Sequence, residues 1–272
     1  MKYKSFTIAA ITLLHSLGYS EICLTTDGQA TPLKTAAAAC QDSITILKEQ
    51  ARMGDGQAYL QLARCYHDGF GVEHDFLAMW TMAKMAVQYG AISRSEDFLA
   101  DYAPDDPDRI LMEAMQDTGR RHSKEILKKT ETLDSRNKAY AALIKGCLAL
   151  TDNRKEEAMD LLRLASADGC VLADMAIALN ERGSEAVYDF ADRMPMLYCA
   201  IARGRITTDF SPAEEEQVAH YYRLADEHLC LDDIGVRWLH GYYEHRAQTD
   251  SLSVDSTELH RLRILREKLA RP

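Results

Sequence analysis

The chain has 272 residues, of which 47% are hydrophobic, enough to build a large core. It contains only 14 glycines and 6 prolines, too few for a loop-rich β protein with a turn after every short strand. The formal net charge of −10 disfavours nucleic acid and anionic membrane surfaces as general partners. The small basic clusters, Lys128-Lys129 and the arginines at 261, 263 and 266, are expected to be solvated or to lie at helix ends.

The N-terminal residues resemble a secretory signal peptide. Residues 1–4 give a short basic start, residues 6–14 an apolar run, and Gly18 and Ser20 stand at the positions that a signal peptidase reads. The apolar run is too short to span a bilayer, so we expect no stable membrane insertion. Residues 1–20 therefore predict export to the periplasm or secretion. The alternative is an amphipathic first helix of a cytoplasmic protein.

The cysteines argue against export. No two of them form a C-x-x-C pair, so zinc and thioredoxin-like sites are disfavoured. Their wide spacing within apolar stretches is typical of buried, reduced thiols, whereas oxidising compartments favour paired cysteines. The seven are Cys23, Cys40, Cys65, Cys147, Cys170, Cys199 and Cys230.

Residues 21–31 have the character of a linker, and residues 32–53 predict a first helix. A more informative pattern follows. Ala58, Leu62 and Tyr66 recur every four residues between Asp55 and His67, which predicts an amphipathic helix rather than a strand. The glycine-containing bend after it breaks the helix, since glycine tolerates positive φ.

A second helix is predicted from Asp75, whose carboxylate can cap it, to the neighbourhood of Gly90. Its small residues include Ala78 and Ala83, which would let two antiparallel helix axes approach closely. Such a hairpin cannot bury its apolar face alone and requires stacked neighbours.

This pattern resembles the Sel-1-like repeat, a relative of the tetratricopeptide repeat found in bacteria and eukaryotes. The resemblance covers residues 51–90 and departs from the family at Ala63, where glycine is usual. It implies an all-α fold, a right-handed α-solenoid of antiparallel helix pairs. The matching residues, which we expect to serve packing, are Gly54, Ala58, Leu62, Ala63, Tyr66, Gly69, Gly71, Val72, Asp75, Ala78, Trp80, Ala83 and Gly90.

Further copies are suggested by other small residues five positions apart. They are Ala141 with Gly146, Ala173 with Ala178, and Val236 with Gly241. We therefore expect a helical array over residues 32–272, with a clear repeat at 54–90 and degenerate pairs at about 137–169, 170–204 and 212–270.

Three helix starts are predicted outside these small-residue pairs. Residues 91–136 form an insertion or degenerate helices, within which Asp106 is expected to cap a helix that starts at Pro107. Ser211-Pro212 begins another helix, and a last helix after Ser256 is expected to cap the open end of the array.

The histidines between His220 and His245 do not form a metallopeptidase motif. His240 and His245 are five residues apart, about 140° around a helix, so they would not face one ion. The sequence also contains neither a Walker-type phosphate loop nor a G-x-S-x-G nucleophile motif. We therefore assign no catalytic, cofactor-binding or metal-binding residue.

The resemblance implies a non-enzymatic scaffold or adaptor that binds a protein or peptide on the concave face of the array. The candidate groove residues on the first helix of the clear repeat are Tyr59, Gln61 and Arg64, which lie outside its packing stripe. Three alternatives stay open: a regulator or accessory subunit of a cell-envelope enzyme or secretion system, an enzyme, or a secreted effector-like protein.

Overall fold

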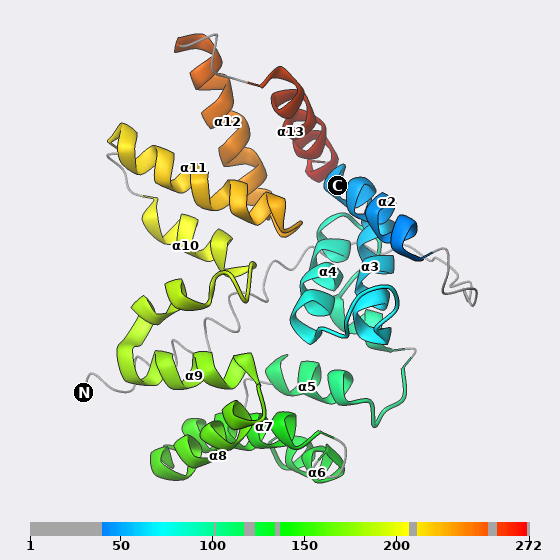
Figure 1. Ribbon diagram of the computed structural model, residues 1–272, viewed down its shortest axis with the longest axis vertical. Coiled ribbons are helices and arrows are strands. Elements are labelled where there is room, and N and C mark those ends of the chain that lie inside the picture. Colours follow the sequence, from blue (N-terminus) through cyan, green and yellow to red (C-terminus); the bar gives the residue numbers. More distant parts are fainter. Residues whose placement is uncertain are drawn as a thin grey trace. The chain divides into compact units, whose positions relative to one another are not determined.

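The computed structural model describes residues 40–100, 102–116, 123–133, 137–206, 211–249 and 255–270. The predicted signal peptide at residues 1–20 and the predicted linker at residues 21–31 lie outside these ranges. The described residues form twelve α-helices and two 3-10 helices, with no strand among them (Figure 1). The predicted all-α class is therefore confirmed.

Contacts divide the chain into two units. The first unit covers Leu99–Arg193, and the second combines the described residues up to Phe98 with those from Met194 onward. Ala58 and Ala173, which we expected in one continuous stack of hairpins, therefore lie in different units.

The first three helices of the second unit follow the sequence pattern closely. They are α2 (Cys40–Arg52), α3 (Gly56–Asp68) and α4 (Phe76–Gln88). The carboxylate of Asp55 caps α3 by accepting from the backbone N–H groups of Gln57 and Ala58. Asp75 caps α4 in the same way, and Gly69 ends α3 with a φ of 64°.

The helices α3 and α4 pack against each other through the expected small residues. Ala63 and Ala83 are completely buried, and Trp80 is 3% exposed. The glycines of the pattern allow backbone conformations that other residues disfavour, since all four have positive φ. They are Gly54, Gly69, Gly71 and Gly90. The hairpin predicted from residues 54–90 is therefore present.

The first unit contains two helices in the region that we described as an insertion or degenerate helices, α5 (Pro107–Gln116) and α6 (Ser123–Leu133). Asp106 caps α5 by accepting from the N–H groups of Asp108 and Arg109, as predicted. Both helices pack against α7 (Lys138–Thr151).

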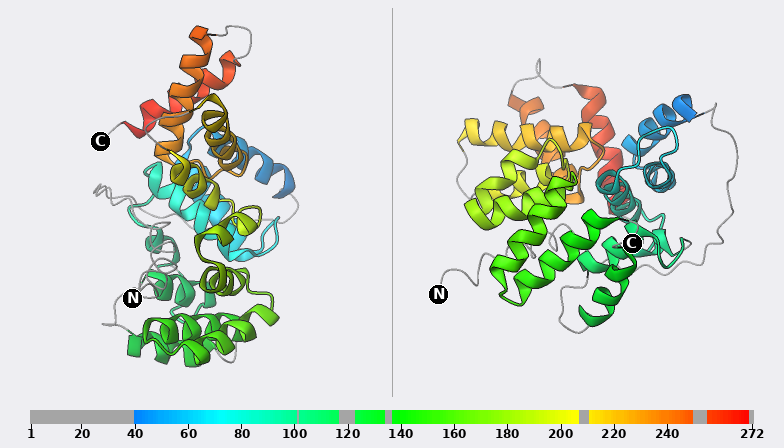
Figure 2. Two further views of the ribbon diagram at one scale, coloured as in Figure 1. Left: turned by 90° about the vertical axis from the view of Figure 1, so that its left-hand side faces the viewer. Right: turned by 60° about the horizontal axis from the view of Figure 1, so that its bottom comes forward.

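A close helix pair forms the centre of the first unit. The helix α7 packs against α8 (Lys155–Ala167), and the two lie side by side at the bottom of the left-hand view in Figure 2. Ala141, Ala158 and Ala165 are completely buried there. Residues 137–169 thus contain two packed helices, and their place in a repeat array stays a prediction.

The predicted pair over residues 170–204 is wrong. The helix α9 (Val171–Arg182) packs against α8 and against the 3-10 helix η3 (Gly183–Phe190), while α10 (Leu197–Arg205) packs against α11 (Pro212–Glu227). Gly183, with a φ of 75°, ends α9 and leads directly into η3. The chain therefore continues from α9 as a tighter helix, and α10 belongs to the other unit.

The second unit is completed by α11, α12 (Asp233–Thr249) and α13 (Ser256–Leu269), each packed on the next. Ser211 and Glu214 form a capping box at the start of α11, with Pro212 at its first turn. The small pair Val236 and Gly241 does not mark a helix crossing, because an added Cβ at Gly241 would meet nothing within 4 Å.

The last helix does not cap an open end. Lys268 of α13 donates to the carbonyl oxygens of Met53 and Gly54, at 2.7 and 3.2 Å, in the turn between α2 and α3. In a one-directional array each repeat contacts only its sequence neighbours. Here the first and last described helices belong to the same unit, so the expected role of α13 is corrected.

Candidate functional site

The structure removes Tyr59 from the predicted groove. Its side chain is only 3% exposed, and its ring stacks on that of Tyr89 with the centroids 5.5 Å apart. Burial raises the pKa of Tyr59, and nearby Asp226 raises it further. The stripe of Ala58, Leu62 and Tyr66 predicts only the face of α3 that packs against α4. Tyr59 lies on a second buried face of the same helix.

The other two groove candidates keep part of their surface. Gln61 and Arg64 are both partly exposed on α3. Their role in binding a partner therefore stays a prediction.

An aromatic cluster that the sequence interpretation missed connects α11 and α12. Trp238 and Tyr242 are four residues apart on one face of α12, and their rings stack with centroids 5.4 Å apart at 12°. Tyr243 meets Tyr242 edge-on at 5.3 Å, and Tyr222 of α11 lies 5.6 Å from Trp238. Trp238 and Tyr243 are partly exposed, while Tyr222 and Tyr242 are buried.

One carboxylate connects two arginines to the hydroxyl group of Tyr242. Glu216 accepts from Arg223 at 2.5 Å, from Arg246 at 3.3 Å and from the hydroxyl of Tyr242. The hydrogen bond from Tyr242, aided by Arg223, lowers the pKa of Glu216. The guanidinium of Arg246 also lies 5.8 Å from the ring centre of Tyr242, within cation–π range.

We call Glu216, Arg223, Trp238, Tyr242, Tyr243 and Arg246 the α11–α12 aromatic surface. Tryptophan, tyrosine and arginine are the residues that most often dominate the binding energy of protein interfaces. The i, i+4 spacing of Trp238 and Tyr242 could have revealed this surface. We interpreted residues 236–243 through their small pair alone and so overlooked it.

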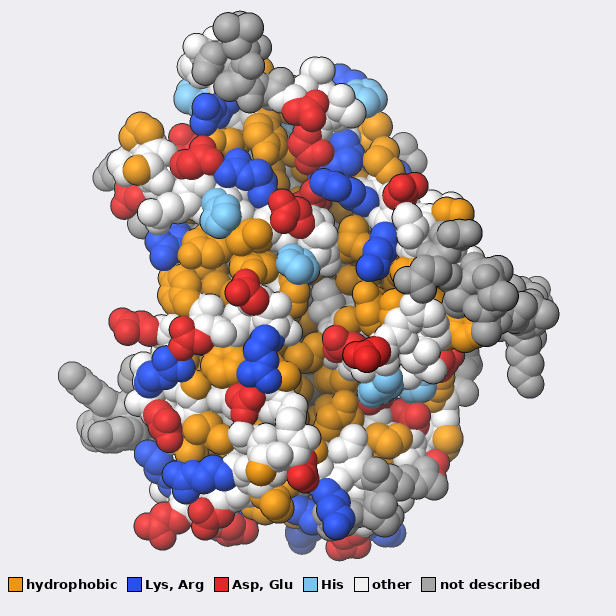
Figure 3. All heavy atoms as spheres, in the orientation of Figure 1, with side chains coloured by type: hydrophobic (Ala, Val, Ile, Leu, Met, Phe, Trp, Pro, Cys, Tyr) orange, Lys and Arg blue, Asp and Glu red, His pale blue; other side chains and the backbone are white. Residues whose placement is uncertain are grey.

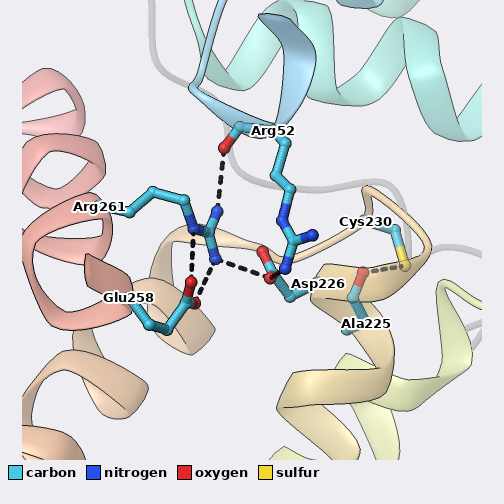
Figure 4. A network of polar contacts seen from close by, with 6 residues as sticks. All are labelled: Arg52, Ala225, Asp226, Cys230, Glu258 and Arg261. Carbon is cyan, nitrogen blue, oxygen red and sulfur yellow. Dashed lines mark hydrogen bonds and ion pairs between the residues drawn. The ribbon is translucent and has the colours of Figure 1, made fainter. Parts of the chain in front are cut away.

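A buried charge network joins three helices of the same unit (Figure 4). The guanidinium of Arg261 lies 2.7 Å from the Asp226 carboxylate, and these side chains are 9% and 10% exposed. Arg261 also donates to Glu258 and to the carbonyl oxygen of Arg52, and Arg52 itself pairs with Asp226 at 3.2 Å. Arg261 is therefore not the solvated residue that its basic segment suggested.

The network follows the rule that buried charges are paired and hydrogen-bonded. Burial raises the pKa of Asp226, although Arg261 and Arg52 favour its charged form. Every residue in it either contacts a partner charge or accepts a bond from one, which is the arrangement of a structural connection between α2, α11 and α13.

The histidine-rich segment contains one buried histidine, His240, which contacts side chains of α12 and α13. His240 is 1% exposed, and its Nδ1 lies 3.0 Å from Arg266 and 3.2 Å from Glu244. Burial lowers the pKa of His240, against the influence of Glu244. Among the described residues, no three or more His, Cys, Asp or Glu side chains gather in a way that could hold a metal ion.

Five cysteines of the described residues are free thiols. Cys199 donates to the carbonyl oxygen of Cys230 at 3.3 Å, and Cys230 donates to that of Ala225 at 3.2 Å. Burial raises the pKa of both thiols. High pKa values and burial are typical of unreactive structural cysteines.

Acidic and basic side chains are intermixed with hydrophobic ones on the face of the molecule drawn in Figure 3. Comparison with protein-family models, with curated proteins and with solved structures finds no match for this chain. Among the described residues, no helix combines the length and the apolar character needed to cross a bilayer.

Proposed function

We propose that this protein is a non-enzymatic scaffold or adaptor that binds a protein or peptide partner through the α11–α12 aromatic surface. The observation that carries the proposal is the cluster of partly exposed Trp238 and Tyr243 beside Arg223 and Arg246. Large rings with few rotatable bonds lose little entropy when they bind, and arginine adds directional hydrogen bonds.

The surface is also pre-ordered. Stacking holds Trp238 and Tyr242 in place, and Glu216 holds both arginines. A partner would therefore meet side chains that already occupy fixed positions, which lowers the entropic cost of association.

The resemblance to Sel-1-like repeats supports a finer form of the proposal. In that form the helix pairs belong to a right-handed α-solenoid, and Gln61 and Arg64 of the matching hairpin contribute to its concave face. The cap at Asp75 and the burial of Ala58 and Ala83 support this form of the proposal. We propose no cofactor.

Export through residues 1–20 is the second part of the proposal, and its support is the basic start followed by an apolar run. The intact mass of the protein isolated from its native cells tests it. Loss of about the first 20 residues is expected for a cleaved signal peptide. A chain that retains Met1 would instead favour the cytoplasm.

The binding proposal is tested by chemical crosslinking in the native cells, followed by pull-down and mass spectrometry. Trp238→Ala and Arg246→Ala should both lose the partners that the unsubstituted protein captures. Tyr188→Ala is the matched control, because Tyr188 is a 45% exposed aromatic residue of the other unit.

Circular dichroism at the capture temperature establishes that each variant is folded. The same partners captured by Trp238→Ala, Arg246→Ala and the unsubstituted protein would show that binding does not use the α11–α12 aromatic surface.

A further inference from the structure

The helix α13 packs on α12 and makes several charged contacts with the rest of its unit. Its buried residues are Arg261, Leu262 and Leu265, so only two apolar side chains of this helix are fully covered. Elements with little buried apolar surface open at lower free energy than the core around them. By this measure α13 can open at lower free energy than α3 and α4, which bury more apolar side chains.

Two charged residues of α13 contact the last residue of α2 and the turn after it. Arg261 donates to the carbonyl oxygen of Arg52 at 2.9 Å, and Lys268 donates to those of Met53 and Gly54. The last carbonyls of a helix lack partners within the helix and form the negative end of its dipole. Arg261 therefore satisfies an acceptor that α2 leaves open, and Lys268 satisfies two acceptors in the turn that follows.

Asp226 of α11 provides a further contact to α13. It lies 2.7 Å from Arg261 and so compensates the guanidinium that α13 brings into a buried position. Arg52 contacts the same carboxylate at 3.2 Å and stays 48% exposed. Asp226 therefore keeps a cationic partner when Arg261 is withdrawn.

The turn between α2 and α3 also packs closely against α13. A Cβ atom added to Gly54 would lie 2.7 Å from Cδ2 of Leu265, which is too close for any real contact. Gly54 also has a φ of +73°, a conformation that side chains disfavour. The first residue of the repeat pattern thus forms the surface on which α13 lies.

We infer that α13 is a charge-held clasp, a conformational device that opens as one element while α3, α4 and α11 stay folded. Opening withdraws Arg261 and Lys268 from the end of α2 and uncovers Leu262, Leu265 and the turn at Met53 and Gly54. The inference concerns a different surface from the α11–α12 aromatic surface and does not depend on the proposed function.

Hydrogen exchange of the full-length protein, followed by mass spectrometry, tests the clasp. In the unsubstituted protein, the amides of α13 should exchange faster than those of α3 and α11. Arg261→Met keeps the aliphatic part of the side chain but removes the charge, and should accelerate exchange in α13 by about tenfold or more. Exchange in α3 and α11 should not change.

Lys268→Met is a second variant that avoids a buried substitution, since Lys268 is exposed. It should accelerate exchange in α13 by a smaller factor, and added salt should reproduce part of this effect by screening the exposed ammonium. Arg263→Met is the matched control on the same helix. Arg263 is exposed and contacts His260 of α13 itself, so exchange should stay unchanged.

Three results would overturn the inference. One is that α13 exchanges as slowly as α3 in the unsubstituted protein. Another is that neither Arg261→Met nor Lys268→Met accelerates exchange in α13. The third is that α13, α3 and α11 accelerate together in Lys268→Met, because the helix would then open only with its whole unit.

Discussion

Gly146 of α7 faces Leu162 of α8 so closely that a side chain at position 146 has no free space. An added Cβ would lie 3.0 Å from Cγ of Leu162 and 3.3 Å from the carbonyl oxygen of Ala158. We therefore expect Gly146→Ala to lower the free energy of unfolding by about 1–3 kcal/mol, because crowding outweighs the better helix propensity of alanine. Chemical denaturation followed by circular dichroism measures the change.

Gly241→Ala is the control for this prediction. Gly241 lies inside α12, where an added Cβ meets nothing within 4 Å. Its replacement should raise the free energy of unfolding by about 0.5–1 kcal/mol through the unfolded state and helix propensity. If Gly146→Ala stabilises the protein as much as Gly241→Ala does, the close crossing of α7 and α8 is refuted.

Tyr222→Phe should stabilise the protein. The hydroxyl of Tyr222 is buried and has no hydrogen-bond partner among the described residues. An unsatisfied buried polar group costs about 1–3 kcal/mol, and phenylalanine keeps the ring that packs against Trp238. Thermal unfolding should therefore show a higher midpoint for Tyr222→Phe.

Tyr242→Phe provides the opposite case on the neighbouring helix. Its hydroxyl donates to Glu216 and accepts from Arg246. Removing it leaves the fold intact but should lower the midpoint, because hydrogen bonds to charged groups contribute about 1.5–3 kcal/mol at most. A lower midpoint for Tyr222→Phe than for Tyr242→Phe would contradict the assigned contacts.

The contact between α5 and α6 should weaken in acid. Burial acts to raise the pKa of Glu113, but hydrogen bonds from Lys129 and Arg109 outweigh it and lower the pKa below the ordinary 4.5. A lowered pKa in the folded state means that the stabilisation is complete above pH 4.5 and is lost as pH falls through the folded value.

The size of this effect is below about 1 kcal/mol, because Glu113 and Lys129 are both partly exposed. Hydrogen exchange of α5 and α6 at several pH values measures it. Glu113→Gln should abolish this pH dependence, whereas Glu131→Gln, at an exposed position of α6, should retain it. Equal pH profiles for Glu113→Gln and the unsubstituted protein would rule out Glu113 as the titrating group.

Thiol labelling should distinguish the cysteines of the described residues. Burial raises the pKa of Cys199 and Cys230, so both the thiolate form and access to it are suppressed. In the reduced native protein we expect iodoacetamide to modify these two more than about tenfold more slowly than the half-buried Cys65. Peptide mass spectrometry identifies the labelled residues, and comparable rates at Cys65 and Cys199 would refute their burial.

Local signals made the first hairpin predictable from sequence. Asp55, Gly69 and Asp75 act on backbone groups within a few residues, so their meaning does not depend on the rest of the fold. The capping box at Ser211 and the cap at Asp106 were predictable for the same reason.

Long-range contacts were not predictable in this way. Arg261 and the carbonyl of Arg52 are 209 positions apart, and nothing in the basic segment around Arg261 marks the one arginine that is buried. The failed pair over residues 170–204 has a similar origin. The small residues Ala173 and Ala178 indicate that another element packs closely against α9, but they do not identify that element.

The sequence interpretation missed the α11–α12 aromatic surface because it relied on the spacing of small residues. Small residues were used to locate helix crossings, and this made Tyr59 look free because it lies off that stripe. Its burial against Tyr89 shows that α3 has a second packed face. Only the arrangement of α11 beside α12 brings Glu216 to the hydroxyl of Tyr242 and Tyr222 to the ring of Trp238.

Because α13 packs on the turn after α2, the second unit cannot complete its contacts before α13 has been synthesised. Residues 99–193 leave the ribosome as one uninterrupted stretch and have all their own neighbours as soon as α9 and η3 emerge. The helix α2 and the turn after it emerge earlier, whereas their contacts Asp226 and Leu265 follow residues 99–193 in the chain. The helix α2 and the turn after it therefore lack these contacts until α11 and α13 have been synthesised.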